Sequence, residues 1–269
     1  MPDMELNVTQ TDIARGLRQV GLAAGDVVMV HSSLSRFGRV AGGAGAVVRA
    51  LLEVLGPAGT LVAPTFSTFF VGPPGQVFDR ERTPSRMGAI SEAVRTWPGA
   101  RRSSHPGHPV SAIGARAAEI AGLQCDVGWG PDSPLAALER LDARLLLLGV
   151  GYNTVTIFHV PEYEARVPYR RVQHFTGTVI IDGRPGPVRM PMFRRLPDLK
   201  YDFEQLGREL EGAGLVRETT IGRSHVRLFD VPPALALERD RIAADPLYLL
   251  DAESRQRFER SQDGPENGG

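Results

Sequence analysis

The sequence contains one cysteine, Cys125, among 269 residues. A single cysteine excludes an intrachain disulfide and any metal site built from several cysteines. We interpret Cys125 as a small residue that fills buried or half-buried space, rather than as a nucleophile. The chain also lacks an apolar run of transmembrane length, and it does not open with a basic stretch followed by an apolar one. We therefore expect a cytoplasmic protein without a membrane partner.

An excess of charge of either sign is missing too, because 31 Lys and Arg residues balance 31 Asp and Glu residues. A protein whose main partner is nucleic acid needs a basic surface to neutralise phosphates, so we expect no such partner. The motifs H-E-x-x-H and G-x-S-x-G, typical of zinc proteases and serine hydrolases, do not occur. We accordingly expect no resident metal.

The chain is organised around residues 144–166, where a short apolar run precedes several charged residues. Leu145 to Leu148 is ended by glycines, which is typical of a strand buried on both faces. His159 and Glu162 follow, and in a helix this spacing places both on one face. A neutral imidazole beside a carboxylate can act as a general base, because the carboxylate fixes its tautomer and stabilises the imidazolium. The alternative is a surface ion pair of little consequence.

Pro161 lies between these two residues, and proline is well tolerated only in the first turn of a helix. Either the helix begins near Val160, or His159 lies just ahead of it. In both cases the pair follows the carboxyl end of a strand, where the catalytic groups of open α/β sheets gather.

The first half of the chain alternates expected strands and helices. The expected strand 26–30 runs into the polar residues His31 to Ser35, then a glycine-containing loop, then an apolar helix over 46–55. Backbone amides and hydroxyls between a strand and a helix start form a site suited to phosphate. An ordinary strand–helix turn with a serine cap is the alternative. A strand over 59–66 leaves Thr65 at its tip, and residues 67–84 are expected to form a long functional loop.

The pattern changes after residue 166. Residues 175–190 alternate about a turn at Asp182 to Arg184, which predicts a hairpin. We expect a helix over 203–213, a strand over 218–229 and a helix over 232–244. The whole pattern predicts an α/β layered core with an antiparallel extension. We expect one domain over 1–258, with its core at 9–166, its extension at 167–258 and a disordered tail at 259–269.

Four blocks of residues also occur in a characteristic order between residues 26 and 166. They are Val30-His31-Ser32-Ser33-Leu34 with Val40-Ala41-Gly42-Gly43; Gly56-Pro57 through Gly59-Thr60-Leu61-Val62 to Pro64-Thr65-Phe66; Phe78-Asp79, Thr83-Pro84-Ser85, Met87-Gly88 and Ser104-His105-Pro106 with Ser111 and Gly114; and Gly130-Pro131-Asp132-Ser133-Pro134-Leu135 with Leu148-Gly149-Val150-Gly151, Phe158-His159 and Glu162. Together they resemble the aminoglycoside 3-N-acetyltransferases, an antibiotic N-acetyltransferase family distinct from the GCN5-related fold. The last third of the chain resembles the family only in outline.

The resemblance implies transfer of acetyl from acetyl-coenzyme A to the 3-amino group of the deoxystreptamine ring of aminoglycoside antibiotics, which confers resistance. It implies a three-layer α/β/α sandwich with a central mostly parallel or mixed sheet and an antiparallel C-terminal extension. The expected partners are therefore small molecules, an aminoglycoside and coenzyme A, bound by a monomer or homodimer.

Under this interpretation His159 is the general base for the attacking amine, and Glu162 orients it or binds the cationic acceptor. Thr65 donates a hydrogen bond to the oxyanion or thiolate, with an ordinary turn threonine as the alternative. Arg101 and Arg102 are candidate partners for the coenzyme's phosphates. The residues expected to bind the coenzyme are His31, Ser32, Ser33, Leu34, Arg36, Val40, Gly42, Gly43, His105 and Ser111.

A polycationic acceptor requires carboxylates around its site, which the neutral overall charge must then conceal as a local patch. The expected substrate-binding residues are Asp79, Glu162 and Glu164. The alternative for each is a solvated carboxylate or a helix cap. We expect His108, His174 and His225 to be structural or exposed.

Three other functions stay open. An enzyme with the same coenzyme and base could acylate a non-antibiotic biosynthetic amine. A metal-assisted hydrolase could use His159 and Glu162 as ligands. A coenzyme- or nucleotide-binding module without catalysis would explain the strand–loop–helix at residue 26, but it would leave His159 without a role.

Overall fold

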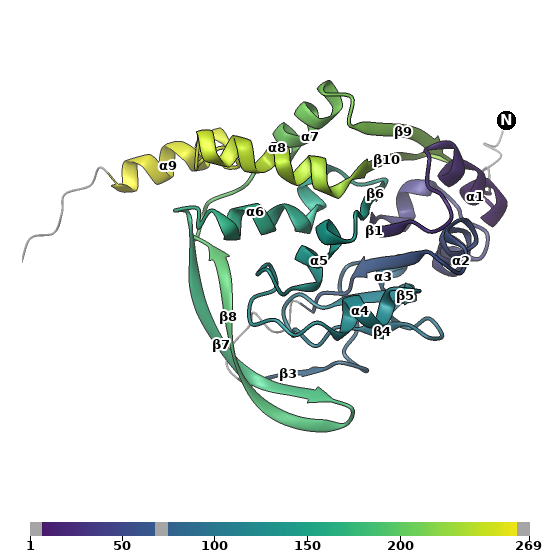
Figure 1. The fold of residues 1–269 in the computed structure, drawn as a ribbon, viewed down its shortest axis with the longest axis horizontal. Coiled ribbons are helices and arrows are strands. Elements are labelled where there is room, and N and C mark those ends of the chain that lie inside the picture. Colours follow the sequence, from purple (N-terminus) through teal and green to yellow (C-terminus); the bar gives the residue numbers. More distant parts are fainter. Residues whose placement is uncertain (1–6, 68–74, 263–269) are drawn as a thin grey trace, which may run out of the picture.

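The computed structural model describes residues 7–67 and 75–262, and a seven-stranded mixed sheet lies at the centre of this part (Figure 1). Its middle strands run parallel: β2 (Thr60–Pro64), β1 (Val27–Ser32) and β6 (Arg144–Leu148). Antiparallel strands flank them on both sides, with β5 (Val110–Gly114) and β4 (Arg101–Arg102) beyond β2, and β10 (Ser224–Asp230) and β9 (Val216–Ile221) beyond β6. The α/β class and the mixed sheet are confirmed.

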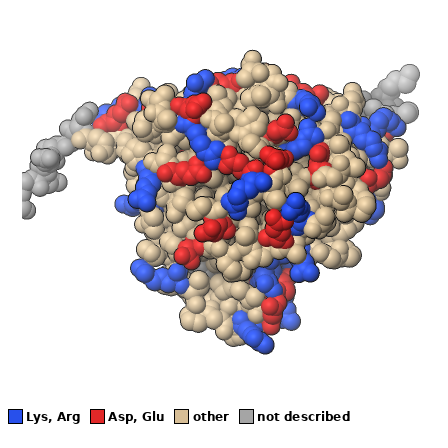
Figure 2. Space-filling model, viewed as in Figure 1, with Lys and Arg blue, Asp and Glu red and all other residues tan. Residues whose placement is uncertain are grey.

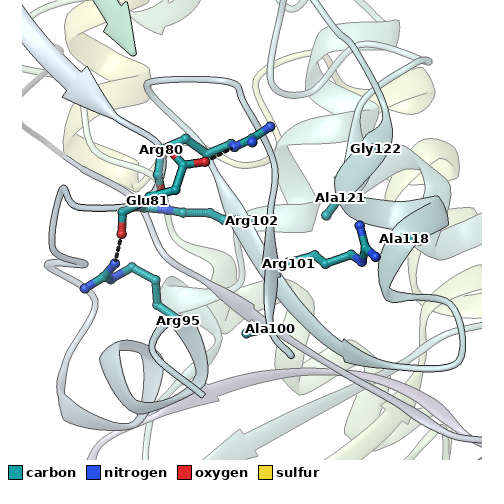
Figure 3. Close-up of a pocket in the computed structure, with 9 residues that line it drawn as sticks. All are labelled: Arg80, Glu81, Arg95, Ala100, Arg101, Arg102, Ala118, Ala121 and Gly122. Carbon is teal, nitrogen blue, oxygen red and sulfur yellow. Dashed lines mark hydrogen bonds and ion pairs between the residues drawn. The ribbon is translucent and has the colours of Figure 1, made fainter. Parts of the chain in front are cut away.

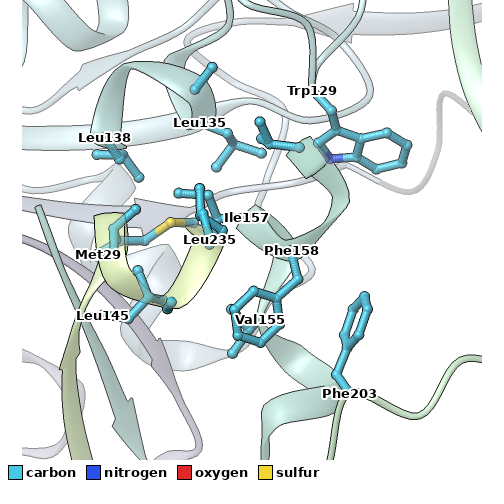
Figure 4. Packing of buried hydrophobic residues seen from close by; sticks show 14 of the residues in the cluster. Met29, Trp129, Leu135, Leu138, Leu145, Val155, Ile157, Phe158, Phe203 and Leu235 are labelled. Carbon is cyan, nitrogen blue, oxygen red and sulfur yellow. The ribbon is translucent and has the colours of Figure 1, made fainter. Parts of the chain in front are cut away.

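The middle strands are buried on both faces, as the apolar run in β6 predicted. Leu145 and Leu147 enter one core, while Leu146 and Leu148 enter the other. The second core is closed by α1 (Gln10–Gln19), α2 (Gly43–Leu55) and α3 (Ala89–Arg95). The first core, shown in Figure 4, is closed by α4 (Ala117–Gly122), α5 (Pro134–Arg140), α6 (His159–Glu164), α7 (Phe203–Gly212), α8 (Val231–Ala244) and α9 (Ala252–Gln262).

Local signals in the sequence fix where several helices begin. Thr9 caps α1 and forms a capping box with Asp12, in which each side chain accepts the other's backbone amide. Ser133 accepts the amide of Ala136 at the start of α5, and Pro134 occupies the first turn. These caps satisfy amides that would otherwise lack partners, so the helices start where the polar residues stand.

The predicted hairpin forms β7 (Arg170–Ile181) and β8 (Arg184–Arg195). It does not join the central sheet. Instead β3 (Gln76–Asp79) pairs in parallel with β7, and the three strands form a separate sheet (Figure 1). The expected antiparallel extension is thus divided, and only β9 and β10 add to the central sheet. β3 lies in the expected loop 67–84, of which residues 68–74 fall outside the described residues.

The two ends of the chain refine the expected domain limits. α9 continues to Gln262, past the expected domain end at 258, and residues 263–269 of the expected tail fall outside the described residues. Gly16 of α1 packs against Ile221 of β9, so the first helix contacts the last third of the chain. None of the helices described here is long and apolar enough to cross a membrane.

Candidate active site

The segment that follows β6 carries the predicted base. Gly149 turns the chain with a φ of 71°, and a Cβ at this position would lie 2.4 Å from the Cβ of Arg36, so only glycine fits. Two 3₁₀ turns, η3 (Tyr152–Thr154) and η4 (Thr156–Phe158), then lead into α6, which begins at His159. Pro161 lies in the first turn of α6, where its missing amide hydrogen is not needed.

His159 and Glu162 are in direct contact. Nδ1 of His159 lies 2.5 Å from Oε2 of Glu162, and the phenol of Tyr169 donates to Oε1 of Glu162 at 2.7 Å. Nη2 of Arg170 lies 2.8 Å from the same Oε2 and 2.9 Å from Nδ1 of His159. Nδ1 cannot donate to the carboxylate and accept from the guanidinium at once. Because the ionised carboxylate is the stronger acceptor, both groups donate to it, and Nε2 of His159 is left as the acceptor.

His159, Glu162, Tyr169 and Arg170 form a cluster that we call the His159 network, and burial and charge set the protonation of its first two members. Glu162 is completely buried and His159 is 7% exposed. Burial lowers the pKa of His159 to about 4, with a further lowering by the Arg170 charge and an opposing effect of Glu162. Burial acts to raise the pKa of Glu162, but the Arg170 charge and the hydrogen bonds from His159 and Tyr169 outweigh it and hold that pKa at about 2. At neutral pH an uncharged imidazole therefore faces an ionised carboxylate.

His159 lines a pocket of about 310 Å³, which we call the His159 pocket. The Trp129 ring packs against the imidazole with centroids 4.7 Å apart, and the His108 ring lies 4.4 Å from that of Trp129. The opposite wall comes from Arg170 at the start of β7 and from residues between 192 and 201, which end β8 and form the turn after it. Within the described part of the chain, Asp198 is the only carboxylate that lines this pocket.

Half of the predicted coenzyme residues line a second pocket, of about 540 Å³. It lies between the loop after β1 and the start of α3, where Gly88 and Ala89 form part of its wall. Gly43 is the first residue of α2, so the amino end of this helix borders the pocket. The predicted residues in its lining are Ser32, Ser33, Leu34, Val40 and Gly43.

Three neighbours of this loop were also predicted to bind the coenzyme, and they do not line the second pocket. His31 is buried in β1, and burial lowers its pKa to about 4. Arg36 lies against Gly149, at the turn that leads to the base. Gly42 precedes α2 in the left-handed conformation, with a φ of 82°. These residues shape the loop rather than the wall of the pocket.

The predicted catalytic residue Thr65 lies with Ser111, not with His159. Both hydroxyls are buried, 3.0 Å apart, between the ends of β2 and β5. Thr65 also donates to the carbonyl oxygen of Pro109 at 3.1 Å. Thr65 and Ser111 line neither the His159 pocket nor the second pocket.

His105 is buried in the segment before β5, where its Nδ1 accepts the amides of Gly107 and His108. Its ring stacks on that of His108 with centroids 5.5 Å apart. His105 lines a third pocket, of about 360 Å³, between Ser104–Pro106 and the hairpin of β7 and β8. It is thus separate from the predicted coenzyme residues of the β1 loop.

The carboxylates predicted to bind the substrate do not converge on the His159 pocket. Oδ1 of Asp79 accepts the amides of Glu81 and Arg82 and so closes a turn after β3. Glu164 is exposed and pairs with Arg239 at 2.8 Å. Glu162 has no exposed surface with which to meet a substrate. Figure 2 shows acidic and basic side chains interspersed over the face in view.

The candidate phosphate ligands Arg101 and Arg102 border a different pocket, of about 350 Å³, beside the edge strand β4 (Figure 3). Arg102 donates to the carbonyl oxygens of Thr65, Arg80 and Thr83, and burial lowers its pKa to about 10. Arg102 therefore holds backbone segments together. Among the described residues no three His, Cys, Asp or Glu side chains converge in a way that could hold a metal ion.

Apart from His159, the residues that line the His159 pocket were not predicted from the sequence, and neither was Tyr169. Among those nearest to His159 are Arg170, His108 and Trp129. Tyr169 and Arg170 follow α6 and reach Glu162 only because the chain turns back after the helix, at Arg166 with a φ of 50°. His108 and Trp129 come from separate loops. A tyrosine and arginine ahead of an alternating segment carry no local signal of a catalytic role, and packing alone brings them to His159.

A family model described as aminoglycoside 3-N-acetyltransferase matches residues 29–243. Aminoglycoside N(3)-acetyltransferase VII of Streptomyces paromomycinus is 33% identical to this chain over 260 residues, covering 83% of the chain and 87% of the relative. The chain is thus similar to this relative over most of both lengths.

Two solved structures are similar as well. The binary complex of AAC-IIIb with CoASH matches with a TM-score of 0.77 at 28% identity, covering 86% of this chain and 95% of that one. A histidine-to-alanine mutant of aminoglycoside acetyltransferase AAC(3)-IVa in complex with gentamicin matches with a TM-score of 0.80 at 28% identity, covering 94% and 95%.

Proposed function

The chain belongs to the aminoglycoside 3-N-acetyltransferase family, and from that premise we propose that it transfers acetyl from acetyl-coenzyme A to an amine, with His159 as general base. The observation that carries this proposal is the buried His159 network, whose uncharged imidazole lines a pocket while its Nδ1 side is held by Glu162. A surface ion pair would be exposed, whereas Glu162 is completely buried.

The reaction requires a base because the attacking nitrogen becomes positive as it bonds to the thioester carbon. The C–N bond forms, the C–S bond breaks and the thiolate departs. Nε2 of His159 accepts the proton that the nitrogen loses, directly or through water, and then returns it to the thiolate. Glu162 stabilises the imidazolium in between, and Arg170 keeps Glu162 ionised throughout.

The second pocket is our proposed coenzyme pocket. Ser32 and Ser33 offer hydroxyls, and the amino end of α2 at Gly43 offers backbone amides to phosphate oxygens. His31, Arg36 and Gly42 belong to the same stretch of chain but do not line this pocket. We assign Thr65 and Ser111 to the joint between β2 and β5 instead of the oxyanion, because their hydroxyls are engaged with each other. A relative's complex with CoASH supports the choice of coenzyme.

Two classes of acceptor fit this chemistry. The 3-amino group of an aminoglycoside is the first, supported by the names of the relatives and by the gentamicin complex of one of them. A non-antibiotic amine is the second, and one observation favours it: arginines outnumber carboxylates in the lining of the His159 pocket. Both classes use the same base, so the transfer itself is tested first.

Replacement of the base tests the transfer. With acetyl-coenzyme A and a panel of aminoglycosides and other amines, His159→Ala is expected to lower kcat about 10²–10⁴-fold, measured as thiol release. The matched control is His225→Ala, since His225 is an exposed histidine on β10 whose side chain pairs with Glu218. Near-native turnover by His159→Ala, or an equal loss of kcat in the control, would contradict the assignment of His159 as general base.

A further inference from the structure

We infer that the acceptor amine of this chain also carries an anionic group, a phosphate or a carboxylate, which Arg194 and Arg195 bind beside His159. This inference rests on the proposed function, because it names the class of substrate that enters the same pocket. Four observations carry it: the register of the hairpin, the partners of its arginines, the way two of them are held, and the charges around the pocket.

The register of β7 and β8 sets arginines against arginines at the base of the hairpin. Arg170 lies directly opposite Arg195, and Arg171 lies directly opposite Arg194. Like charges in directly opposite positions of a strand pair are destabilising. Because successive side chains of a strand point to opposite faces, the hairpin carries one such arginine pair on each face at the end that borders the His159 pocket.

Only one of these four arginines has a carboxylate partner within residues 7–67 and 75–262. Arg170 is paired with Glu162, as part of the His159 network. Arg194 and Arg195 form no ion pair with any described carboxylate, and both line the His159 pocket. Their charges are therefore available to a ligand in that pocket.

Aromatic rings orient the two available guanidinium groups without neutralising them. The guanidinium carbon of Arg194 lies 5.5 Å from the centroid of the Phe175 ring, and that of Arg195 lies 4.8 Å from the centroid of the Tyr201 ring. A guanidinium stacked on a ring keeps its N–H donors in the plane free for a carboxylate or phosphate. Both groups are thus held in place before any ligand binds.

The carboxylates near the pocket are too few to reverse its charge. Asp198 is the one carboxylate among the described lining residues. Asp251 lies near Arg195, but its carboxylate first caps α9 through Ser254, and Lys200 acts on it as well. A polycation that entered the His159 pocket would face two unpaired guanidinium groups against one carboxylate, whereas an anionic amine would meet complementary charge.

The coenzyme's own phosphates are the competing explanation for these arginines. During transfer the attacking amine lies between the acetyl carbon and Nε2 of His159, so the acetyl carbon is close to the base. The pantetheine arm separates this carbon from the phosphates by many bonds. Arg195 is close enough to His159 for its charge to lower the pKa of the imidazole. An anion held there would accordingly belong to the acceptor.

A matched pair of probes tests the inference. Glucosamine and glucosamine 6-phosphate differ only in the phosphate, muramic acid adds a carboxylate to the same amino sugar, and kanamycin A supplies a polycation. We expect kcat/KM to be about 10- to 100-fold higher for at least one anionic probe than for glucosamine. The double variant Arg194→Glu, Arg195→Glu should abolish that preference and leave the KM for acetyl-coenzyme A unchanged.

The exposed Arg260 at the far end of α9 provides the control, because Arg260→Glu makes the same type of charge change away from every pocket described. It should keep the preference. A second readout avoids turnover: calorimetry with the His159→Ala protein should detect binding of the preferred anionic probe, and adding Arg194→Glu, Arg195→Glu should remove it.

The outcomes separate the inference from the proposed function. Absence of thiol release with every amine, including kanamycin A, would overturn the proposed function. Turnover of kanamycin A or glucosamine without any preference for the anionic probes would overturn the inference alone. A rise in the KM for acetyl-coenzyme A in the arginine double variant, with the preference intact, would assign these arginines to the coenzyme and also overturn it.

Discussion

Arg170 and Arg195 lie directly opposite each other in the hairpin and line the same pocket, yet their surroundings differ. Arg170 is buried and bound to Glu162, so its charge serves the protein by keeping a carboxylate ionised. Arg195 is half-buried, stacked on Tyr201, and has no carboxylate partner in the described part of the chain. The comparison teaches that an arginine's role follows from its partners rather than from its position in a site.

The largest effect is expected on the buried side of this comparison. Glu162→Gln would leave the Arg170 charge buried without a counter-charge and would remove the group that stabilises the imidazolium. We expect a loss of about 3–5 kcal/mol in the free energy of unfolding and a fall in kcat of at least about 10²-fold. Denaturant unfolding and thiol release measure the two effects.

The control for this variant is Glu164→Gln on the same helix, since Glu164 is exposed and forms only a surface pair with Arg239. It should cost less than about 1 kcal/mol. Equal losses in the two variants would mean that burial does not distinguish these carboxylates.

Acid is expected to give the next largest effect. Burial lowers the pKa of His31, His105 and His159 to about 4, and it also holds the pKa of His108 well below its usual value. Because these folded-state pKa values lie below that of an unfolded histidine, the unfolded chain binds more protons, and stability falls as the pH drops from 6.5 towards 4. Each such histidine contributes up to about 1.4 kcal/mol per pH unit in that window.

Glu238 opposes this trend, because burial raises its pKa well above the usual range and the folded state then binds a proton that the unfolded state lacks. Four histidines outweigh one carboxyl, so the Tm should fall steadily between pH 6.5 and 4.5. Glu162 adds a further loss only below pH 4.5, since its pKa is held at about 2. A Tm that is constant from pH 7 to 4.5 would contradict the burial of neutral imidazoles.

The smallest effect is expected for the half-buried arginine. Arg195→Ala removes a like-charge neighbour of Arg170 and breaks no ion pair with a described carboxylate. We expect its free energy of unfolding to stay within about 0.5 kcal/mol of the wild type, or to rise slightly. Arg170→Ala is the matched comparison and should lose about 3–5 kcal/mol because Glu162 would be left buried and unpaired. Similar losses of unfolding free energy in the two variants would contradict the distinction between a paired and an unpaired arginine.

The sequence predicted the parts of the site that depend on short stretches of chain. The apolar run of β6, the spacing of His159 and Glu162, and the loop from Ser32 to Gly43 are each local, so strand and helix periodicity place them correctly. Pro161 was the one local conflict, and it is resolved because α6 begins two residues earlier, at His159.

The parts that depend on long-range pairing could not be predicted in this way. β3 pairs with β7 across about a hundred residues of sequence, and the opposition of Arg171 and Arg194 follows from the register of the hairpin. Charge was also the only basis for predicting Asp79 and Glu164 as substrate residues, and in the folded chain Asp79 closes a turn and Glu164 pairs with Arg239. A carboxylate's partner is set by packing, which a single sequence does not contain.

Gly149 has a consequence for how the two pockets relate to each other. Its backbone meets the side chain of Arg36 from the loop of the coenzyme pocket and the hydroxyl of Ser224 from β10, with no room for even one added carbon. The spacing between the loop of the proposed coenzyme pocket and the helix that carries the proposed base is thus set by direct contact with the main chain of Gly149. Any side chain at position 149 would push these segments apart. Acyl transfer depends steeply on the distance between the attacking nitrogen and the thioester carbon.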